Sequence, residues 1–199
     1  MKAVIVASLT AIALAGPAFA DAVIGQAAPD FTAVTTQNET ITLSELEGLV
    51  VLEWTNHGCP FVKKHYKSGN MQATQTKAVA QGATWISIIS SAKGKQGHVS
   101  AEKANSLTDE RAAKPTHVVL DASGEIGRLY GAQTTPHMYV INNQTLEYAG
   151  AIDSIPSGNV DHIEKAENYV LSALSNIAAG EAVVTPFSKA YGCDVKYGS

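Results

Sequence analysis

Residues 49–64 read LVVLEWTNHGCPFVKK: an apolar run, a short polar loop, then a cysteine and a proline. An apolar run of this length predicts a buried strand over Leu49–Trp54. Pro60 favours the first position of a helix, where its missing N–H costs nothing. Cys59 is therefore predicted to lie between a strand end and a helix start, where unpaired N–H groups and the positive end of the helix favour thiolate over thiol. Such a position suits a nucleophile.

Strands and helices alternate along the rest of the chain. Further strands are predicted at Thr84–Ile89, His117–Leu120, His137–Ile141 and Leu146–Ala149. Helices are predicted between Pro60 and Gly82 with a break at residues 68–70, between Ser100 and Arg111, and over Asp161–Ala179. The last of these ends at Gly180 and has one apolar face, made of Ile163, Ala166, Val170, Leu174 and Ile177. This order of elements predicts an α/β sandwich.

A second signal lies far from Cys59 in the sequence. Thr135 and Pro136 directly precede the strand predicted at His137. Proline has no N–H for the strand ladder and is tolerated there only in special places. Two interpretations stay open: a cis Thr135-Pro136 bond with a structural or functional role, or an ordinary proline at a strand start.

Together, these residues resemble the thioredoxin fold and, within it, the redoxin and peroxiredoxin-like family. Residues 25–31, GQAAPDF, resemble the family's opening segment, and the strand into Cys59-Pro60 resembles its reactive loop. Thr135-Pro136 matches the family's cis-proline, which packs beside the reactive cysteine. Residues 56–63, NHGCPFVK, further resemble a subgroup called peroxiredoxin-like 1. The resemblance covers essentially the whole mature chain and implies an α/β thioredoxin-like fold with a central mixed sheet flanked by helices.

The chain departs from the family's two standard active-site motifs. A thioredoxin-type pair of cysteines would need a second cysteine at position 62 or 56, where the chain has Val62 and Asn56. Peroxiredoxins carry proline and threonine or serine seven and three residues before the reactive cysteine, and here those positions hold Leu52 and Asn56. The resemblance is therefore more specific for the fold than for the activity.

Cys193 is the other cysteine of the chain and stands 134 positions after Cys59. Two lone cysteines pair readily in an oxidising compartment, and the cost of closing a long loop grows only logarithmically. Three interpretations compete: Cys193 as the resolving thiol for Cys59, a permanent disulfide that staples the tail, or cysteines that are unpaired or pair between molecules. Residues 183–187, VVTPF, are too apolar for a free linker, so the tail over 183–199 is expected to pack on the domain.

Three histidines stand near the two signals: His57, His65 and His137. An imidazole beside sulfur would lower the thiol pKa, and Cys59 with His57 and His137 would suit copper or zinc. No spacing matches a metal motif, so we favour solvated loop histidines and predict no metal or other cofactor. Lys63 and Lys64, in the first helical turn, are also expected to be solvated.

Residues 1–20 predict a cleavable signal peptide, with Lys2, an apolar stretch over 3–15 and a cleavage site after Ala20. No later segment approaches the eighteen apolar residues of a membrane span. The expected protein is therefore periplasmic or secreted, with a thioredoxin-like domain over 21–182. The full chain has 14 basic and 18 acidic residues, a net charge of −4, and loss of Lys2 makes it −5. This mild acidity argues against nucleic acid or an anionic membrane as partner.

The resemblance and the residues together favour an exported thiol oxidoreductase. Cys59 would attack a peroxide or a disulfide, and Cys193 would resolve the product. Pro136, with Thr135, would hold backbone that faces the substrate, and Asn56 and His57 would polarise the site. The expected partners are an external thiol reductant or a disulfide-bearing protein, with a peroxide or a small thiol as substrate. The alternative is a non-catalytic module that binds a metal ion or a protein partner, with Cys59–Cys193 as a structural disulfide.

Overall fold

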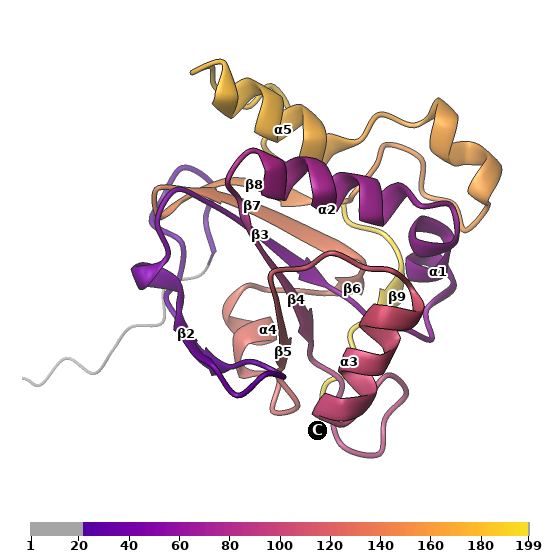
Figure 1. The fold of residues 1–199 in the computed structure, drawn as a ribbon. Helices are drawn as coiled ribbons and strands as arrows, with labels where there is room; N and C mark the ends of the chain where they lie inside the picture. Colours follow the sequence, from indigo (N-terminus) through magenta and orange to yellow (C-terminus); the bar gives the residue numbers. More distant parts are fainter. Residues whose placement is uncertain (1–21, 199) are drawn as a thin grey trace, which may run out of the picture.

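The computed structural model describes residues 22–198, so the predicted signal peptide lies outside the described residues. A five-stranded mixed sheet forms the centre, in the order β5-β4-β3-β7-β8 (Figure 1). β3 (Leu49–Trp54) lies in the middle, parallel to β4 (Thr84–Ile89) and antiparallel to β7 (His137–Asn142). The edges are β5 (His117–Leu120) beside β4 and β8 (Thr145–Gly150) beside β7. All five predicted core strands are confirmed.

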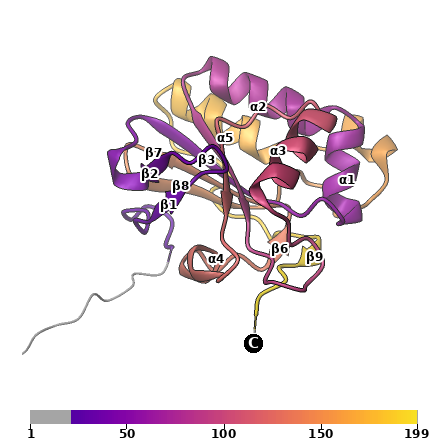
Figure 2. The same cartoon turned by 60° about the horizontal axis from the view of Figure 1, so that its bottom comes forward.

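Helices cover both faces of this sheet, as expected (Figure 2). Alternate residues of a strand point to opposite faces, so Val51 of β3 packs under one layer of helices and Leu52 and Trp54 under the other. The first layer holds α1 (Pro60–Lys67), α2 (Asn70–Ala80) and α5 (Tyr169–Ala178), with α3 (Ala101–Glu110) against β4 and β5. The second layer holds α4 (Glu125–Leu129).

The second face is completed by an N-terminal segment that the sequence did not predict. β1 (Thr32–Val34) and β2 (Thr40–Thr42) form a separate antiparallel pair, followed by a short 3₁₀ turn, η1 (Leu43–Glu45). Phe31, Ile41 and Leu43 bury their side chains against the face that carries Trp54. Strands of three residues are too short to show a period-two pattern, so no signal marked them.

The predicted helix over Asp161–Ala179 is wrong in its first part. Residues Val160–Lys165 form a 3₁₀ segment, η2, and Ala166 is extended, with φ −90° and ψ 140°. Asn168 then caps a new helix, α5, by accepting a hydrogen bond from the Leu171 N–H. The break is held by two hydrogen bonds between Ser154 and Glu167. Apolar spacing continues across the break, and for this reason the sequence pattern predicted a single helix. The predicted end of the helix at Gly180 is correct, and this glycine has a φ of +71°.

After α5 the chain returns along the domain to the far end of the sheet. Ala149 in β8 bonds to the backbone of Pro186 and Ser188, and β9 (Cys193–Asp194) pairs antiparallel with β6 (Thr134–Thr135). The yellow C-terminal segment in Figure 1 follows this path. Backbone pairing, more than burial of apolar side chains, fixes the tail, since Val184 and Phe187 are 79% and 65% exposed. Within residues 22–198, no helix has the length and apolar character needed to cross a bilayer.

Candidate active site at Cys59

Cys59 is the N-cap residue of α1, at the end of the loop that follows β3. Its backbone is extended, with φ −71° and ψ 126°, and Pro60 occupies the first helical turn. The Cys59 N–H donates to the Asn56 carbonyl at 3.0 Å, and the Cys59 carbonyl accepts from the Lys63 N–H at 2.9 Å. The side chain is buried, with 1% exposure. The predicted position between a strand end and a helix start is therefore confirmed.

The cis-proline strand lies directly against this thiol. The Thr135-Pro136 peptide bond is cis, which confirms the predicted geometry of this bond. The Cys59 thiol donates a hydrogen bond to the Thr135 carbonyl at 3.1 Å. Two segments that stand 76 positions apart in sequence therefore meet at the sulfur.

The tail brings Cys193 to the same place. In the pairing of β6 with β9, Cys193 is the register partner of Thr135, the residue whose carbonyl contacts Cys59. Both cysteines are free thiols in this structure, and Cys193 packs against the apolar cluster that contains Cys59. The structure thus places both thiols of the chain side by side in the reduced protein.

The two thiols have opposite pKa shifts. Burial raises the pKa of Cys59, but hydrogen bonds outweigh it and hold the net pKa below the ordinary value. These bonds come from the Cys193 thiol, the N–H groups of Val62 and Cys193, and the Thr135 side chain. For Cys193, burial and then the hydrogen bond to Cys59 and its charge raise the pKa to about 12. Cys59 therefore ionises first, and Cys193 keeps its proton and donates it to the Cys59 sulfur.

The Asn56 side chain holds the loop, and no hydrogen bond joins the side chain of Asn56 or His57 to the sulfur. The Asn56 amide donates to the Gln96 side chain at 2.8 Å and accepts from the Gly58 N–H at 2.9 Å. His57 is half-buried, and burial lowers its pKa, with a further decrease from the charges of Arg111, Lys63 and Lys103. His57 is therefore mainly neutral near pH 7, and within residues 22–198 its Nδ1 has no hydrogen-bond partner.

The expectation of solvated loop histidines is wrong for His65 and His137, which are 0% and 8% exposed. Burial lowers the pKa of His65 to about 4, although the Asp153 charge opposes the shift. Burial alone lowers the pKa of His137 to about 4. Within the described part of the chain, no group of three or more His, Cys, Asp or Glu side chains is arranged to hold a metal ion.

A buried ionic network, which the sequence did not predict, ties α1 to the tail. Lys64 was expected to be solvated but is 1% exposed. Its Nζ donates to Asp153 at 2.9 Å, to the Ile155 carbonyl at 3.3 Å and to the Tyr191 hydroxyl at 3.3 Å. The Tyr191 hydroxyl also donates to Asp153, and its ring packs edge-on against Phe61. Tyr191 stands two residues before Cys193, so the network fixes the tail beside the reactive loop.

A second buried acid supports the strand that leads to the loop. Glu53 in β3 is fully buried and accepts hydrogen bonds from four side chains: Tyr66 at 2.8 Å, Ser87 at 2.9 Å, Trp85 at 3.0 Å and Gln75 at 3.2 Å. Buried polar groups with this many partners specify one packing arrangement. Glu53 therefore joins β3, β4, α1 and α2 under the Cys59 loop.

A mixed sheet flanked by helices, a cysteine at the start of α1 and a cis-proline strand against that cysteine define a redoxin of the thioredoxin fold. The chain belongs to the AhpC/TSA family, whose model matches residues 24–149. The resemblance stated from the sequence is therefore confirmed at the level of the family.

Solved structures show the same fold over more of the chain. A hypothetical protein from Sinorhizobium meliloti is 20% identical with a TM-score of 0.75, and the match covers 89% of this chain and 96% of that one. An uncharacterized conserved protein from Geobacillus kaustophilus is 20% identical with a TM-score of 0.72, covering 89% and 93%. Peroxidoxin BcpB from Mycobacterium tuberculosis is 16% identical with a TM-score of 0.54, covering 77% and 97%. No curated protein matches the sequence.

Proposed function

We propose that this protein is an exported thiol oxidoreductase in which Cys59 attacks a peroxide or a disulfide and Cys193 resolves the product. The observation that carries the proposal is the position of the two thiols: Cys193 pairs in β9 with Thr135, whose carbonyl contacts the Cys59 sulfur at 3.1 Å, and both cysteines pack in one apolar cluster. In this arrangement the pKa of Cys59 is lowered and that of Cys193 is raised. A thiolate is the reactive form of cysteine. Once Cys59 is oxidised its charge is gone, and with it one cause of the raised pKa of Cys193, so Cys193 can attack in the second step while its proton leaves with the departing group.

With a peroxide as substrate, the reaction begins at the Cys59 thiolate. The Cys59 thiolate attacks one peroxide oxygen and the O–O bond breaks. The leaving oxygen takes up a proton equivalent to the one that Cys59 released on ionising, so that an alcohol or water leaves and Cys59 becomes a sulfenic acid. The Cys193 sulfur then attacks the Cys59 sulfur, and the hydroxyl leaves with the Cys193 proton as water. An external thiol reductant, or a dithiol protein, returns the Cys59–Cys193 disulfide to two thiols by exchange. With a disulfide substrate, the first product is a mixed disulfide on Cys59.

The other site residues have supporting roles in this proposal. Thr135 and Pro136 carry the backbone that faces the sulfur, Pro60 starts the helix, and Asn56 holds the loop through Gln96. The similarity of residues 56–63 to the peroxiredoxin-like 1 subgroup supports peroxide chemistry, and residues 1–20 support export. The division into residues 21–182 and a tail over 183–199 belongs to the same proposal.

The burial of Cys59 favours a second candidate. A sulfur on a side chain with 1% exposure is poorly accessible to a large substrate, and the tail is held by both β9 and the Lys64 network. A binding module with Cys59–Cys193 as a permanent disulfide fits those two facts.

One variant separates the two functions. In the catalytic proposal, Cys193→Ser with added peroxide accumulates Cys59 as sulfenic and later sulfinic acid, detected as a dimedone adduct by mass spectrometry. The wild-type protein gives the intramolecular disulfide instead, and Cys59→Ser gives neither product. The structural alternative predicts that reduced wild-type protein is inert to peroxide and to small disulfides, and that Cys193→Ser melts at a lower temperature than the oxidised wild type, with a loss of about 2–4 kcal/mol.

A further inference from the structure

A groove runs beside the Cys59 loop, between α1 and the C-terminal end of α3. Its volume is about 470 Å³, which lies within the range of small-molecule sites. It is lined by His57, Val62, Lys63, Tyr66, Lys67, Leu107, Glu110 and Arg111. Two of the lining residues flank Cys59 in the chain: His57 precedes it by two positions, and Val62 follows it by three and contributes a backbone hydrogen bond to the sulfur.

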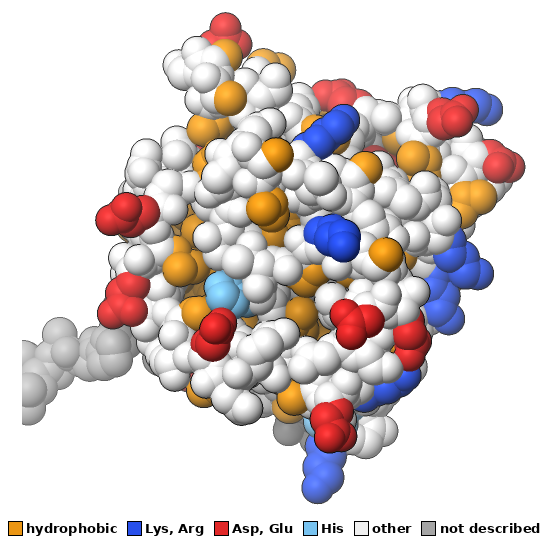
Figure 3. Space-filling view, viewed as in Figure 1, with side chains coloured by type: hydrophobic (Ala, Val, Ile, Leu, Met, Phe, Trp, Pro, Cys, Tyr) orange, Lys and Arg blue, Asp and Glu red, His pale blue; other side chains and the backbone are white. Residues whose placement is uncertain are grey.

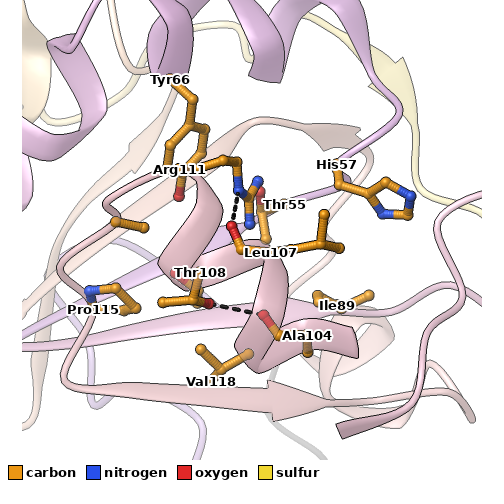
Figure 4. Close-up of a pocket in the computed structure, with 12 residues that line it drawn as sticks. Thr55, His57, Tyr66, Ile89, Ala104, Leu107, Thr108, Arg111, Pro115 and Val118 are labelled. Carbon is orange, nitrogen blue, oxygen red and sulfur yellow. Dashed lines mark hydrogen bonds between the residues drawn. The ribbon is translucent and has the colours of Figure 1, made fainter. Parts of the chain in front are cut away.

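The inner wall of this groove has polar atoms without partners. An adjoining cavity of about 10 Å³ shares His57, Tyr66, Leu107 and Arg111 with the groove and is also lined by Thr55. Thr55 Oγ1, His57 Nδ1 and one Arg111 terminal nitrogen are buried and have no hydrogen-bond partner within residues 22–198. Thr55 is itself 97% buried, with 3% exposure. Figure 4 shows Thr55 between the Arg111 guanidinium and His57. A cavity of this size holds one water or one ligand oxygen.

The groove carries positive charge although the whole chain is acidic. Three basic residues line it: Lys63, Lys67 and Arg111. The acidic lining residue, Glu110, accepts hydrogen bonds from Ser106 at 2.7 Å and from Lys103 at 3.3 Å, so its charge is already partly compensated. The full chain has a net charge of −4. Figure 3 shows Lys and Arg side chains at the right-hand edge of the molecule, where α1 lies in Figure 1, with Asp and Glu side chains next to them towards α3. An unpaired guanidinium nitrogen, a free hydroxyl and lysines at the rim together form a recognition site for a carboxylate.

We propose that this groove binds the carboxylate of a small disulfide that Cys59 attacks, with Thr55 and Arg111 donating to the carboxylate and Lys63 at the rim. This inference rests on the proposed thiol function and specifies its substrate class. The Cys59 thiolate attacks one sulfur of the small disulfide, the S–S bond breaks, and one small thiolate leaves and takes a proton from solvent. Cys193 then attacks the Cys59 sulfur of the mixed disulfide, and the second small thiol leaves with the Cys193 proton. The protein dithiol is oxidised and the small disulfide is reduced.

The kinetic test uses Cys193→Ser, in which the reaction stops at the mixed disulfide on Cys59. Two probes are compared by intact-mass measurement of the adduct: dithiodipropionate, which carries carboxylates, and hydroxyethyl disulfide, which has no charge. One charge-assisted hydrogen bond implies a rate preference of about tenfold or more for the carboxylate. When Arg111→Gln is added to Cys193→Ser, we expect this rate preference to fall to about one. When Lys63→Gln is added instead, the preference should fall only in part.

The chain offers a matched control for Arg111. Arg111 lies over the Tyr66 ring at 4.3 Å and donates to the Leu107 carbonyl, so its loss could also loosen the end of α3. Arg128 lies over the Tyr197 ring at 4.7 Å and donates to backbone carbonyls, but does not line the groove. Arg128→Gln is expected to keep the full preference for dithiodipropionate. An equal loss in both variants would overturn the assignment of Arg111.

A binding measurement distinguishes failure of the groove from failure of the thiol chemistry. Propionate, with propionamide as the uncharged control, is titrated into Cys59→Ser protein while the ring protons of His57 are followed by NMR. We expect a saturable shift with propionate alone, lost in Arg111→Gln. If Cys59 reacts with no disulfide or peroxide but propionate binds, the proposed function fails and the carboxylate site stands. If both disulfides react equally and propionate produces no saturable shift, the groove proposal is wrong and the thiol chemistry stands.

Discussion

Cys59 and Cys193 have the same side chain, yet their surroundings move the thiol pKa in opposite directions. Hydrogen bonding, first of all from the Cys193 thiol, outweighs the burial of Cys59 and lowers its pKa, whereas burial and the neighbouring Cys59 raise the pKa of Cys193. Cys193 therefore has two roles in the proposed cycle: it first donates a hydrogen bond that stabilises the Cys59 thiolate, and it then attacks as a nucleophile. Its role as donor can be tested separately from its role as nucleophile.

We expect Cys193→Ala to raise the pKa of Cys59, because the variant removes the thiol that donates to the sulfur. Cys193→Ser should raise the pKa less, since a hydroxyl still donates. The pH dependence of Cys59 alkylation, or of thiolate absorbance, measures both values. In Cys59→Ser the pKa of Cys193 should fall, because the neighbouring sulfur and its charge are gone. A Cys59 pKa that is the same in the wild type, Cys193→Ala and Cys193→Ser would contradict the role of Cys193 as donor.

A second prediction concerns the stability that the buried ion pair of Lys64 and Asp153 contributes. Removing one partner of a buried ion pair leaves a buried charge without compensation and costs about 3–5 kcal/mol. Lys64→Met leaves Asp153 in that state, so urea denaturation should show a loss of this size. The neighbouring Lys63 is exposed, and Lys63→Met should change the free energy of unfolding by no more than about 0.5 kcal/mol. Equal effects of the two substitutions would show that the ion pair does not form.

At the scale of elements, the short pairing of β6 with β9 decides where Cys193 lies. Gly192 precedes Cys193 with φ +147°, and a Cβ at this position would collide with the Thr135 carbonyl. The glycine therefore allows β9 to approach the strand whose carbonyl contacts Cys59. This two-residue pairing therefore controls the distance between the Cys59 and Cys193 sulfurs, which must form a bond in the resolving step.

We expect Gly192→Ala to move β9 away from β6 and to slow disulfide formation by about tenfold or more, since small displacements of reacting atoms are costly. The measurement is the rate at which the Cys59–Cys193 disulfide appears after a peroxide pulse. Gly158→Ala is the control, because Gly158 has no described atom within 4 Å of an added Cβ. The first step, formation of sulfenic acid on Cys59, should stay unchanged in Gly158→Ala. In Gly192→Ala it should slow less than disulfide formation does, because β9 also carries the Cys193 groups that lower the pKa of Cys59. Normal disulfide formation in Gly192→Ala would remove β9 from the mechanism.

The sequence predicted the elements whose signals are local. β3, the Cys59 loop and α1 follow one another directly, and the five core strands have apolar runs long enough to recognise. The break at Ala166 was missed because apolar spacing continues across it. The carboxylate groove and the Lys64 network were missed for a different reason. Lys64 and Asp153 are 89 positions apart, and no periodic pattern shows which distant polar residues the fold will bring together.

At the scale of the whole molecule, two neutral histidines are buried on different elements of one domain. His65 lies in α1, and His137 starts β7. Burial lowers both pKa values to about 4, against 6.5 for an exposed histidine. Between pH 6.5 and 4 the unfolded chain therefore binds more protons than the folded chain, so the free energy of unfolding decreases as the pH falls.

We expect the fold to keep the full histidine contribution above pH 6.5 and to lose it progressively on acidification. By pH 5, each histidine should have lowered the free energy of unfolding by about 2 kcal/mol, as an upper estimate. Urea denaturation of the reduced protein between pH 7 and 5 measures this loss. His65→Gln and His137→Asn each remove one titrating ring, so each should flatten the pH dependence by about half, whatever its effect on stability at pH 7. If the double variant at His65 and His137 keeps the wild-type slope, other groups cause the acid sensitivity, and the burial of neutral histidines does not determine it.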